Sequence, residues 1–164
     1  MKSIKTLFLI FFSLLSIQAI QSQPIIQKNI PLDSIRLSDP CILTDQQTST
    51  YYMTGTGGRL WKSKDLKYWD GPYKVAQTDS HSWMGPEPMI WAAELHHYKN
   101  KYYYFATFTN KAVIIDTVRG NKIERRASHI LVSDNPEGPY RPMKDSIYLP
   151  ANKPTLDSFE IGRA

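Results

Sequence analysis

An internal repeat constrains the fold of this chain more than any other feature of its sequence. The first copy runs from Asp39 to Tyr73 and the second from Glu94 to Tyr140. Both begin at a carboxylate, continue through a tyrosine-rich stretch, and end with Gly-Pro-Tyr, and Asp157 opens a third copy. A chain that repeats one short pattern of this kind is expected to build one structural unit several times.

The pattern of residues within each copy predicts an all-β domain. Runs of Tyr, Ile, Val, Phe and Thr are separated by Gly, Pro, Asp and Asn, and no long stretch has an apolar period of 3.6 residues. We expect a turn at 65–69, and a long hairpin across 110–126 accounts for the greater length of the second copy. The predicted strands are 51–55, 59–63, 102–109, 113–118 and 129–133.

The copies start 55 and 63 residues apart, at Asp39, Glu94 and Asp157. Repeats of this length favour a β-propeller, in which each copy is a blade of three or four antiparallel strands. A single blade cannot bury both faces of its sheet, so neighbouring blades must stack on it. We expect the strand starts at Asp39 and Glu94 to converge on a common axis. Each Gly-Pro-Tyr is then a closing turn that places an aromatic ring between blades. A β-sandwich would also give short strands, but it would not explain why acids recur at the start of each copy.

The N-terminus has the layout of a secretory signal peptide. Lys2 and Lys5 precede an apolar run from Leu7 to Leu15, and small residues follow at plausible cleavage positions. The run is too short to anchor the chain across a bilayer, and no cysteine stands at the expected cleavage point to carry a lipid. We therefore predict a signal peptide at 1–22, a lead-in at 23–35, a partial propeller domain at 36–164, and a secreted or periplasmic location without a membrane anchor.

Charge, cysteine and histidine content argue against several other classes of protein. Cleavage after Ser22 would lower the formal charge from +5 to +3, and most basic residues are scattered among acids, so we expect no nucleic-acid partner. The single cysteine, Cys41, lies in an apolar stretch and is interpreted as core filler. His96 and His97 are adjacent in a predicted strand and so point to opposite faces. No zinc-binding spacing exists, and we predict neither a metal site nor a cofactor.

The ordered motifs resemble the N-terminal half of glycoside hydrolase family 43, a family of five-bladed β-propellers. The resemblance runs from about Arg36 to Asp157. It rests on a Ser-Asp-Pro opening, a Trp-Ala-x-Glu strand, the motif Ser-Asp-x-Pro-x-Gly-Pro-Tyr and a Leu-Asp opening. Each motif is short, and their order makes the set specific. The resemblance implies a glycosidase that hydrolyses arabinofuranosyl or xylosyl linkages of plant-type polysaccharides with inversion.

The resemblance also assigns roles to two aspartates. Asp39 matches the general base, and Asp157 matches the acid that adjusts the pKa of the general acid. The residues after Asp157 depart from the family's pattern. Without the repeat, Asp39 would be interpreted as a turn residue before proline, because Asp-Pro favours turn initiation.

Two further residues are predicted to contact substrate. Trp91 either stacks on a sugar ring or packs as a wedge between blades. Glu94 either lines the pocket or pairs with a neighbouring backbone group.

Five such blades need about 300 residues, so this chain offers two blades and the opening of a third. The general acid, a glutamate in the family, is expected beyond Ala164. We therefore interpret the chain as an incomplete glycosidase of low activity. The alternative is a secreted β-protein that binds carbohydrate without cleaving it.

Overall fold

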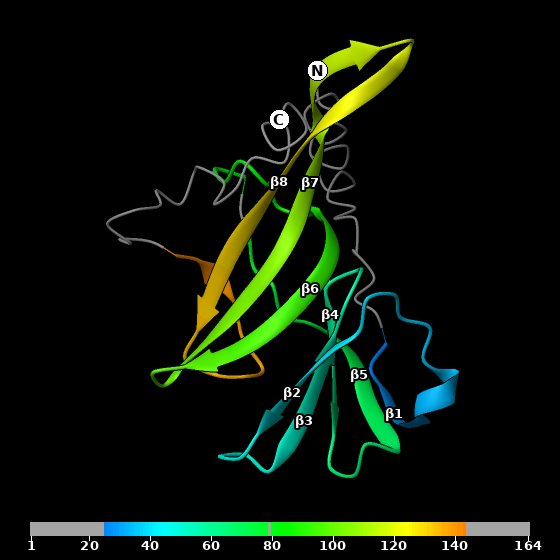
Figure 1. Ribbon diagram of the computed structural model, residues 1–164, viewed down its shortest axis with the longest axis vertical. Helices are drawn as coiled ribbons and strands as arrows, with labels where there is room; N and C mark the ends of the chain where they lie inside the picture. Colours follow the sequence, from blue (N-terminus) through cyan, green and yellow to red (C-terminus); the bar gives the residue numbers. More distant parts are fainter. Residues whose placement is uncertain (1–24, 79, 144–164) are drawn as a thin grey trace, which may run out of the picture.

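Two antiparallel β-sheets that pack side by side form the protein (Figure 1). The structure is a computed structural model that describes residues 25–78 and 80–143. The predicted signal peptide and Asp157 lie outside the described residues. The two sheets confirm the prediction of an all-β fold.

The first sheet contains five strands in the order β1-β5-β4-β3-β2. All neighbouring strands are antiparallel. One turn of 3₁₀ helix, η1 (Leu32–Ser34), follows β1. The strands are β1 (Gln27–Pro31), β2 (Cys41–Asp45), β3 (Thr50–Thr54), β4 (Arg59–Ser63) and β5 (Tyr68–Lys74). β1 lies within the segment predicted as a lead-in and forms the outer strand of this sheet.

The second sheet contains four strands in the order β6-β7-β8-β9. They are β6 (Met89–Tyr98), β7 (Lys101–Val118), β8 (Asn121–Ser133) and β9 (Arg141–Pro142). β7 and β8 form a hairpin that extends well past β6 and β9, as Figure 1 shows. This hairpin confirms the predicted extension of the second copy.

The predicted strands all lie within observed strands or differ from them by one residue. The predicted turn at 65–69 is partly wrong, because Tyr68 and Trp69 already belong to β5. The first Gly-Pro-Tyr is not a closing turn either, since Gly71 to Tyr73 continue β5 and Leu60 lies opposite Tyr73. Proline is tolerated there because β5 is irregular at this point, with a register shift opposite β4.

The two copies use the same local turn chemistry at the end of their third strands. In the first, Ser63 Oγ accepts hydrogen bonds from the backbone N–H groups of Asp65 and Leu66. In the second, Ser133 Oγ accepts one from the N–H of Asn135. Short polar side chains that bond their own backbone in this way favour turns over continued strand. The repeat seen in the sequence is thus also a repeat of structure.

The core lies between the two sheets. Alternate residues of β7 are buried against the first sheet, whereas Phe105 on the opposite face is 39% exposed. The buried side chains of the interface include Tyr52, Leu60, Val75, Met84, Ile90, Leu95, Tyr104, Phe108, Leu131 and Tyr140. Each sheet therefore covers a face that its neighbour could not bury alone.

At the end of β2 away from Asp39, a buried hydrogen bond joins the first sheet to the second. The Tyr102 hydroxyl donates to Asp45 Oδ1 over 3.0 Å. Burial alone would raise the pKa of Asp45, but hydrogen bonds from Thr48 and Tyr102 outweigh it and hold the pKa below its usual 3.8. Burial and the Asp45 carboxylate raise the pKa of Tyr102 to about 12. The phenol therefore stays protonated, and it donates to an ionised acceptor, which is a strong form of hydrogen bond.

The second Gly-Pro-Tyr packs between the sheets as predicted. Tyr140 is fully buried, and its ring lies 5.4 Å from that of Tyr104. Its backbone N–H donates to the carbonyl of Val75, and its carbonyl accepts from the N–H of Gln77. The Tyr140 side chain therefore acts as a wedge between the copies, and its backbone joins the second copy to the segment that follows the first.

Candidate functional site

Asp39 lies in the turn that leads into β2, which contacts β6 of the second sheet, as β3 also does. Its backbone adopts the left-handed conformation, with φ of 54°, and its side chain is exposed. The Thr56 hydroxyl donates to Asp39 Oδ2 over 2.7 Å. The same hydroxyl oxygen accepts from the backbone N–H of Ala92 over 3.0 Å. One carboxylate oxygen is thus fixed by the protein while the group stays open to solvent.

The loop between β3 and β4 holds this arrangement in place. Thr56 N–H donates to the carbonyl of Ser38 over 2.9 Å, and Gly57 N–H donates to the carbonyl of Ile90 over 2.8 Å. A Cβ atom on Gly55 would stand 2.5 Å from the Ser38 carbonyl oxygen and 2.9 Å from that of Asp39. Only glycine lets the loop pass this close to the Asp39 turn.

Sequence reasoning missed Thr56. The signal was the run Gly-Thr-Gly-Gly at 55–58, which indicates a backbone that must approach another segment closely. The threonine inside this run is the polar side chain that joins the Asp39 turn to the start of β6.

Glu94 is not the positional counterpart of Asp39. It lies inside β6, where it pairs with Phe105 of β7. In the first copy, the residue at the same position of the strand pairing is Cys41, which pairs with Thr54 of β3. The counterpart of Asp39 is Ala92, which also has a left-handed backbone, with φ of 44°. The expectation that an acid opens the second copy is therefore wrong. A bulge between Trp91 and Glu94 hides this correspondence in the sequence.

The Glu94 side chain lies on the face of the second sheet away from the first. Its Oε2 is 3.0 Å from Nε2 of His96, and both side chains are more than half exposed. The His96 ring meets Phe105 edge-on, with ring centroids 5.2 Å apart. Glu94 and Phe105 also line an open hollow of about 280 Å³. Its other lining residues are Ala92, Ala106, Thr107, Ser128, His129 and Ile130.

Trp91 is half-buried and held in one orientation on this same face. Its indole N–H donates to Thr109 Oγ1 over 3.1 Å, and Arg126 Nε donates to the same oxygen over 2.9 Å. The Arg126 guanidinium lies 5.1 Å from the centre of the indole ring, within range for a cation–π contact. This geometry leaves both predicted roles of Trp91, sugar stacking and wedge, open.

The structure brings Asp39 and Trp91 to the same end of the two sheets. Ala92, the neighbour of Trp91, donates its N–H to the hydroxyl that binds Asp39. Asp157, the second predicted catalytic acid, lies outside the described residues. Among residues 25–78 and 80–143, no three His, Cys, Asp or Glu side chains gather in a way that could hold a metal ion.

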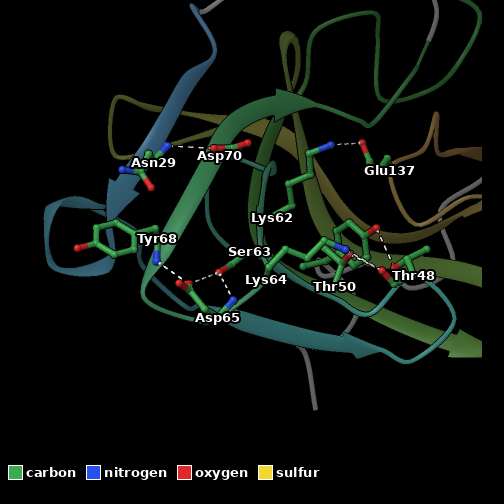
Figure 2. A pocket seen from close by; sticks show the side chains of 11 residues that line it. Asn29, Thr48, Thr50, Lys62, Ser63, Lys64, Asp65, Tyr68, Asp70 and Glu137 are labelled. Atoms are coloured by element: carbon green, nitrogen blue, oxygen red, sulfur yellow. Dashed lines mark hydrogen bonds and ion pairs between the residues drawn. The ribbon is translucent and has the colours of Figure 1, made fainter.

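A larger cavity, of about 430 Å³, lies at the opposite end of the first sheet (Figure 2). Its charged groups are already engaged by the protein. Lys62 pairs with Glu137 over 2.7 Å, and Lys64 Nζ donates to the Thr48 carbonyl over 2.8 Å. Asp65 accepts from backbone N–H groups, which lowers its pKa. The cavity contains none of the predicted site residues, and its contacts hold turns and the junction with the second sheet.

Comparison with known proteins decides the family. The chain matches the family described as Glycosyl hydrolases family 43 over residues 28–161. The chain belongs to this family. It is also similar to an endo-arabinase from Bacteroides thetaiotaomicron, with 35% sequence identity and a TM-score of 0.54 over 80% of this chain and 43% of that enzyme. No curated protein matches the chain.

A second solved structure has the same fold at lower identity. It is a family 43 β-1,3-galactosidase bound to galactodeoxynojirimycin, with 17% identity and a TM-score of 0.51 over 72% of this chain and 36% of that enzyme. The chain therefore spans less than half the length of these two proteins. That share fits the predicted partial propeller. Within residues 25–78 and 80–143, no helix is long and apolar enough to cross a membrane.

Proposed function

We propose that this chain supplies the N-terminal blades of an inverting glycosidase that acts on arabinofuranosyl or xylosyl linkages of plant-type polysaccharides. The observation that carries the proposal is Asp39, an exposed carboxylate fixed by Thr56 at the end of the sheets where Trp91 also lies. The 35% identity to an endo-arabinase favours arabinan over xylan.

In this proposal Asp39 is the general base. It accepts a proton from a water molecule as that water attacks the anomeric carbon of the sugar. Inversion requires room for the water, so the base and the general acid stand about 6.5–9.5 Å apart. The Thr56 hydroxyl holds one carboxylate oxygen, which leaves the other free to bind the water. A base fixed in this way loses little freedom when substrate binds.

The other two acids complete the proposed mechanism. Asp157 adjusts the pKa of the general acid, because a nearby like charge favours the protonated form of a carboxyl group. The general acid itself is a glutamate from a later blade, in a part of the family's length that this chain does not span. Residues 1–164 then carry the proposed base but not the general acid. Trp91 and Glu94 are the proposed contacts to the sugar.

Two substrates separate this proposal from a carbohydrate-binding protein without catalysis. Dinitrophenolate leaves without protonation, so a dinitrophenyl arabinofuranoside needs a base but no general acid. We expect slow release of dinitrophenolate by the 164-residue chain and little or no hydrolysis of linear arabinan. Saturable binding of arabino-oligosaccharides that is lost in Trp91→Ala, without turnover of either substrate, would favour the binding protein. Rapid hydrolysis of linear arabinan would contradict the missing acid.

Secretion or export to the periplasm belongs to the same proposal, because polysaccharides are met outside the cytoplasm. It rests on Lys2, Lys5 and the apolar run that follows them. N-terminal sequencing of exported protein should begin between Ile20 and Pro24. Exported, membrane-free protein that retains Met1 would contradict it.

A further inference from the structure

The long β7–β8 hairpin is the feature that the proposed mechanism does not use. Beyond the pair Thr109 and Arg126, β7 and β8 pair only with each other, because β6 starts opposite Thr109 and β9 pairs further along β8. Figure 1 shows this ribbon standing clear of both sheets. Most of its residues are exposed, including Ile114, Ile115 and Val118, at 43–48%.

The ribbon rises from the end of the molecule that carries Asp39. Its base is Thr109, whose side-chain oxygen binds both the Trp91 indole N–H and Arg126 Nε. Ala92, the residue after Trp91, donates to the Thr56 hydroxyl that holds Asp39. A glycan bound at Asp39 and extended toward Trp91 would therefore run along the ribbon.

The ribbon carries cations that the protein leaves without partners. Lys111, Arg119, Lys122 and Arg125 make no ion pair or side-chain hydrogen bond with any residue in 25–78 or 80–143. By contrast, four lysines of the sheets pair with carboxylates: Lys28, Lys62, Lys74 and Lys101. The ribbon also carries two acids, Asp116 and the half-buried Glu124, and neither forms an ion pair with a residue in 25–78 or 80–143. The Asp116 carboxylate accepts a hydrogen bond from the N–H of Thr117.

We propose that this ribbon is a binding site for acidic glycan, whose uronic acid carboxylates are bound by its unpaired cations, with Lys122 on one face of the ribbon and Arg125 on the other. Arg and Lys form charge-assisted hydrogen bonds with carboxylates. The exposed Ile114, Ile115 and Val118 supply apolar surface for the C–H faces of sugar rings. The proposal rests on the proposed function and narrows its substrate to a polysaccharide that carries carboxylate groups near the cleaved linkage.

The test compares ligands of equal length that differ in charge. Tetragalacturonate and neutral arabinotetraose are titrated into the 164-residue chain, and each Kd is measured by calorimetry at low and at physiological salt. The variant Lys122→Gln/Arg125→Gln removes two ribbon charges. Its matched control, Lys67→Gln/Lys99→Gln, removes two exposed charges from the turns at the opposite end of the sheets. Thermal unfolding confirms that all variants fold.

We expect the ribbon variant to weaken tetragalacturonate binding by about tenfold or more, and the control by less than about twofold. Wild-type affinity for this ligand should fall as salt rises, whereas arabinotetraose binding should be the same in wild type and ribbon variant.

Equal weakening in both variants, or no tetragalacturonate binding by wild type, would overturn the proposal. So would tighter binding to phosphatidylglycerol vesicles that the ribbon variant abolishes, since the ribbon would then be a membrane site. If the wild-type chain binds tetragalacturonate as expected but does not turn over dinitrophenyl arabinofuranoside, the proposed function alone would be overturned.

Discussion

Asp39 owes its position to a glycine that touches its backbone. The Gly55 backbone passes so close to Ser38 and Asp39 that a Cβ atom would overlap two carbonyl oxygens. Backbone atoms cannot turn aside as a flexible side chain can, so any larger residue at position 55 must move the Asp39 turn. The geometry of the proposed base therefore depends on a residue that carries no chemistry.

We expect Gly55→Ala to lower the free energy of unfolding by about 1–3 kcal/mol, the usual cost of forcing extra atoms into a packed site. Gly57→Ala is the control, because nothing lies within 4 Å of its added Cβ and only its left-handed backbone, with φ of 93°, is strained. Denaturant unfolding measures both. Turnover that depends on Asp39 should fall more in Gly55→Ala than in Gly57→Ala. An unchanged Gly55→Ala variant would show that the loop adapts freely.

His129 gives the protein a pH dependence that can be measured separately from activity. It is buried beside Trp83, with ring centroids 6.2 Å apart, and burial lowers its pKa below the usual 6.5. The unfolded chain therefore binds a proton near pH 6.5 that the folded protein takes up only at lower pH. Stability is full above about pH 6.5 and falls as the pH drops below it.

The expected result is a lower free energy of unfolding at pH 5 than at pH 7.5, with a smaller difference in His129→Gln. Urea unfolding at both pH values provides the comparison. Asp45 contributes little over this range, because its lowered pKa places its own loss of stability below about pH 3.8. An identical pH dependence in His129→Gln would assign the effect to other groups.

At the residue scale, sequence reasoning found Asp39 because Ser-Asp-Pro is a local motif. It did not find Thr56 or Arg126, because their partners lie 17 residues or more away in the chain. Glu94 was misplaced for a related reason. Matching carboxylate to carboxylate in the sequence put Glu94 at the place of Asp39, two positions past Ala92, the residue that the strand pairing gives.

At the level of elements, the two Gly-Pro-Tyr motifs have the same sequence and different environments. Tyr140 is fully buried, and its hydroxyl donates to the Pro136 carbonyl over 2.8 Å. Tyr73 is half-buried, and its hydroxyl accepts a hydrogen bond from exposed Lys28. Tyr140 lies within the core between the two sheets, whereas Tyr73 only packs against that core, so Tyr140 should matter more to stability.

Tyr140→Phe should lower the free energy of unfolding by about 1–3 kcal/mol, because the buried Pro136 carbonyl then loses its donor. Tyr73→Phe should change it by less than about 0.5 kcal/mol, because the partner of its hydroxyl is the exposed Lys28 and surface changes are usually this small. Chemical denaturation of the two variants gives a matched comparison of one motif in two places. Equal effects would contradict the wedge role of Tyr140.

Strand positions were predictable because alternating aromatic and β-branched residues mark them, and β4 matches its prediction. The path of β5 was not predictable, because Gly-Pro is ordinarily a turn signal and here continues a strand. Pairing with β1 and β4 on either side outweighs the local preference.

For the whole molecule, the fold class followed from the repeat, and family membership follows from the match over residues 28–161. The chain covers 43% of the similar endo-arabinase, so the activity of a whole propeller stays a proposal for this chain. The role of Asp39 is the central part of that proposal. It can be tested without the general acid, provided that the leaving group needs no proton.

The most direct measurement is the rate of dinitrophenolate release from dinitrophenyl α-L-arabinofuranoside by Asp39→Asn, with and without azide. Without azide, the rate should fall by about 10²-fold or more, because the attacking water loses its base. With azide, which attacks the anomeric carbon without giving up a proton, the rate should recover and the product should be the β-configured arabinofuranosyl azide. Asp33→Asn, an exposed acid in η1, is the control and should match wild type. Wild-type rates in Asp39→Asn, or no rescue by azide, would contradict the assignment of Asp39 as general base.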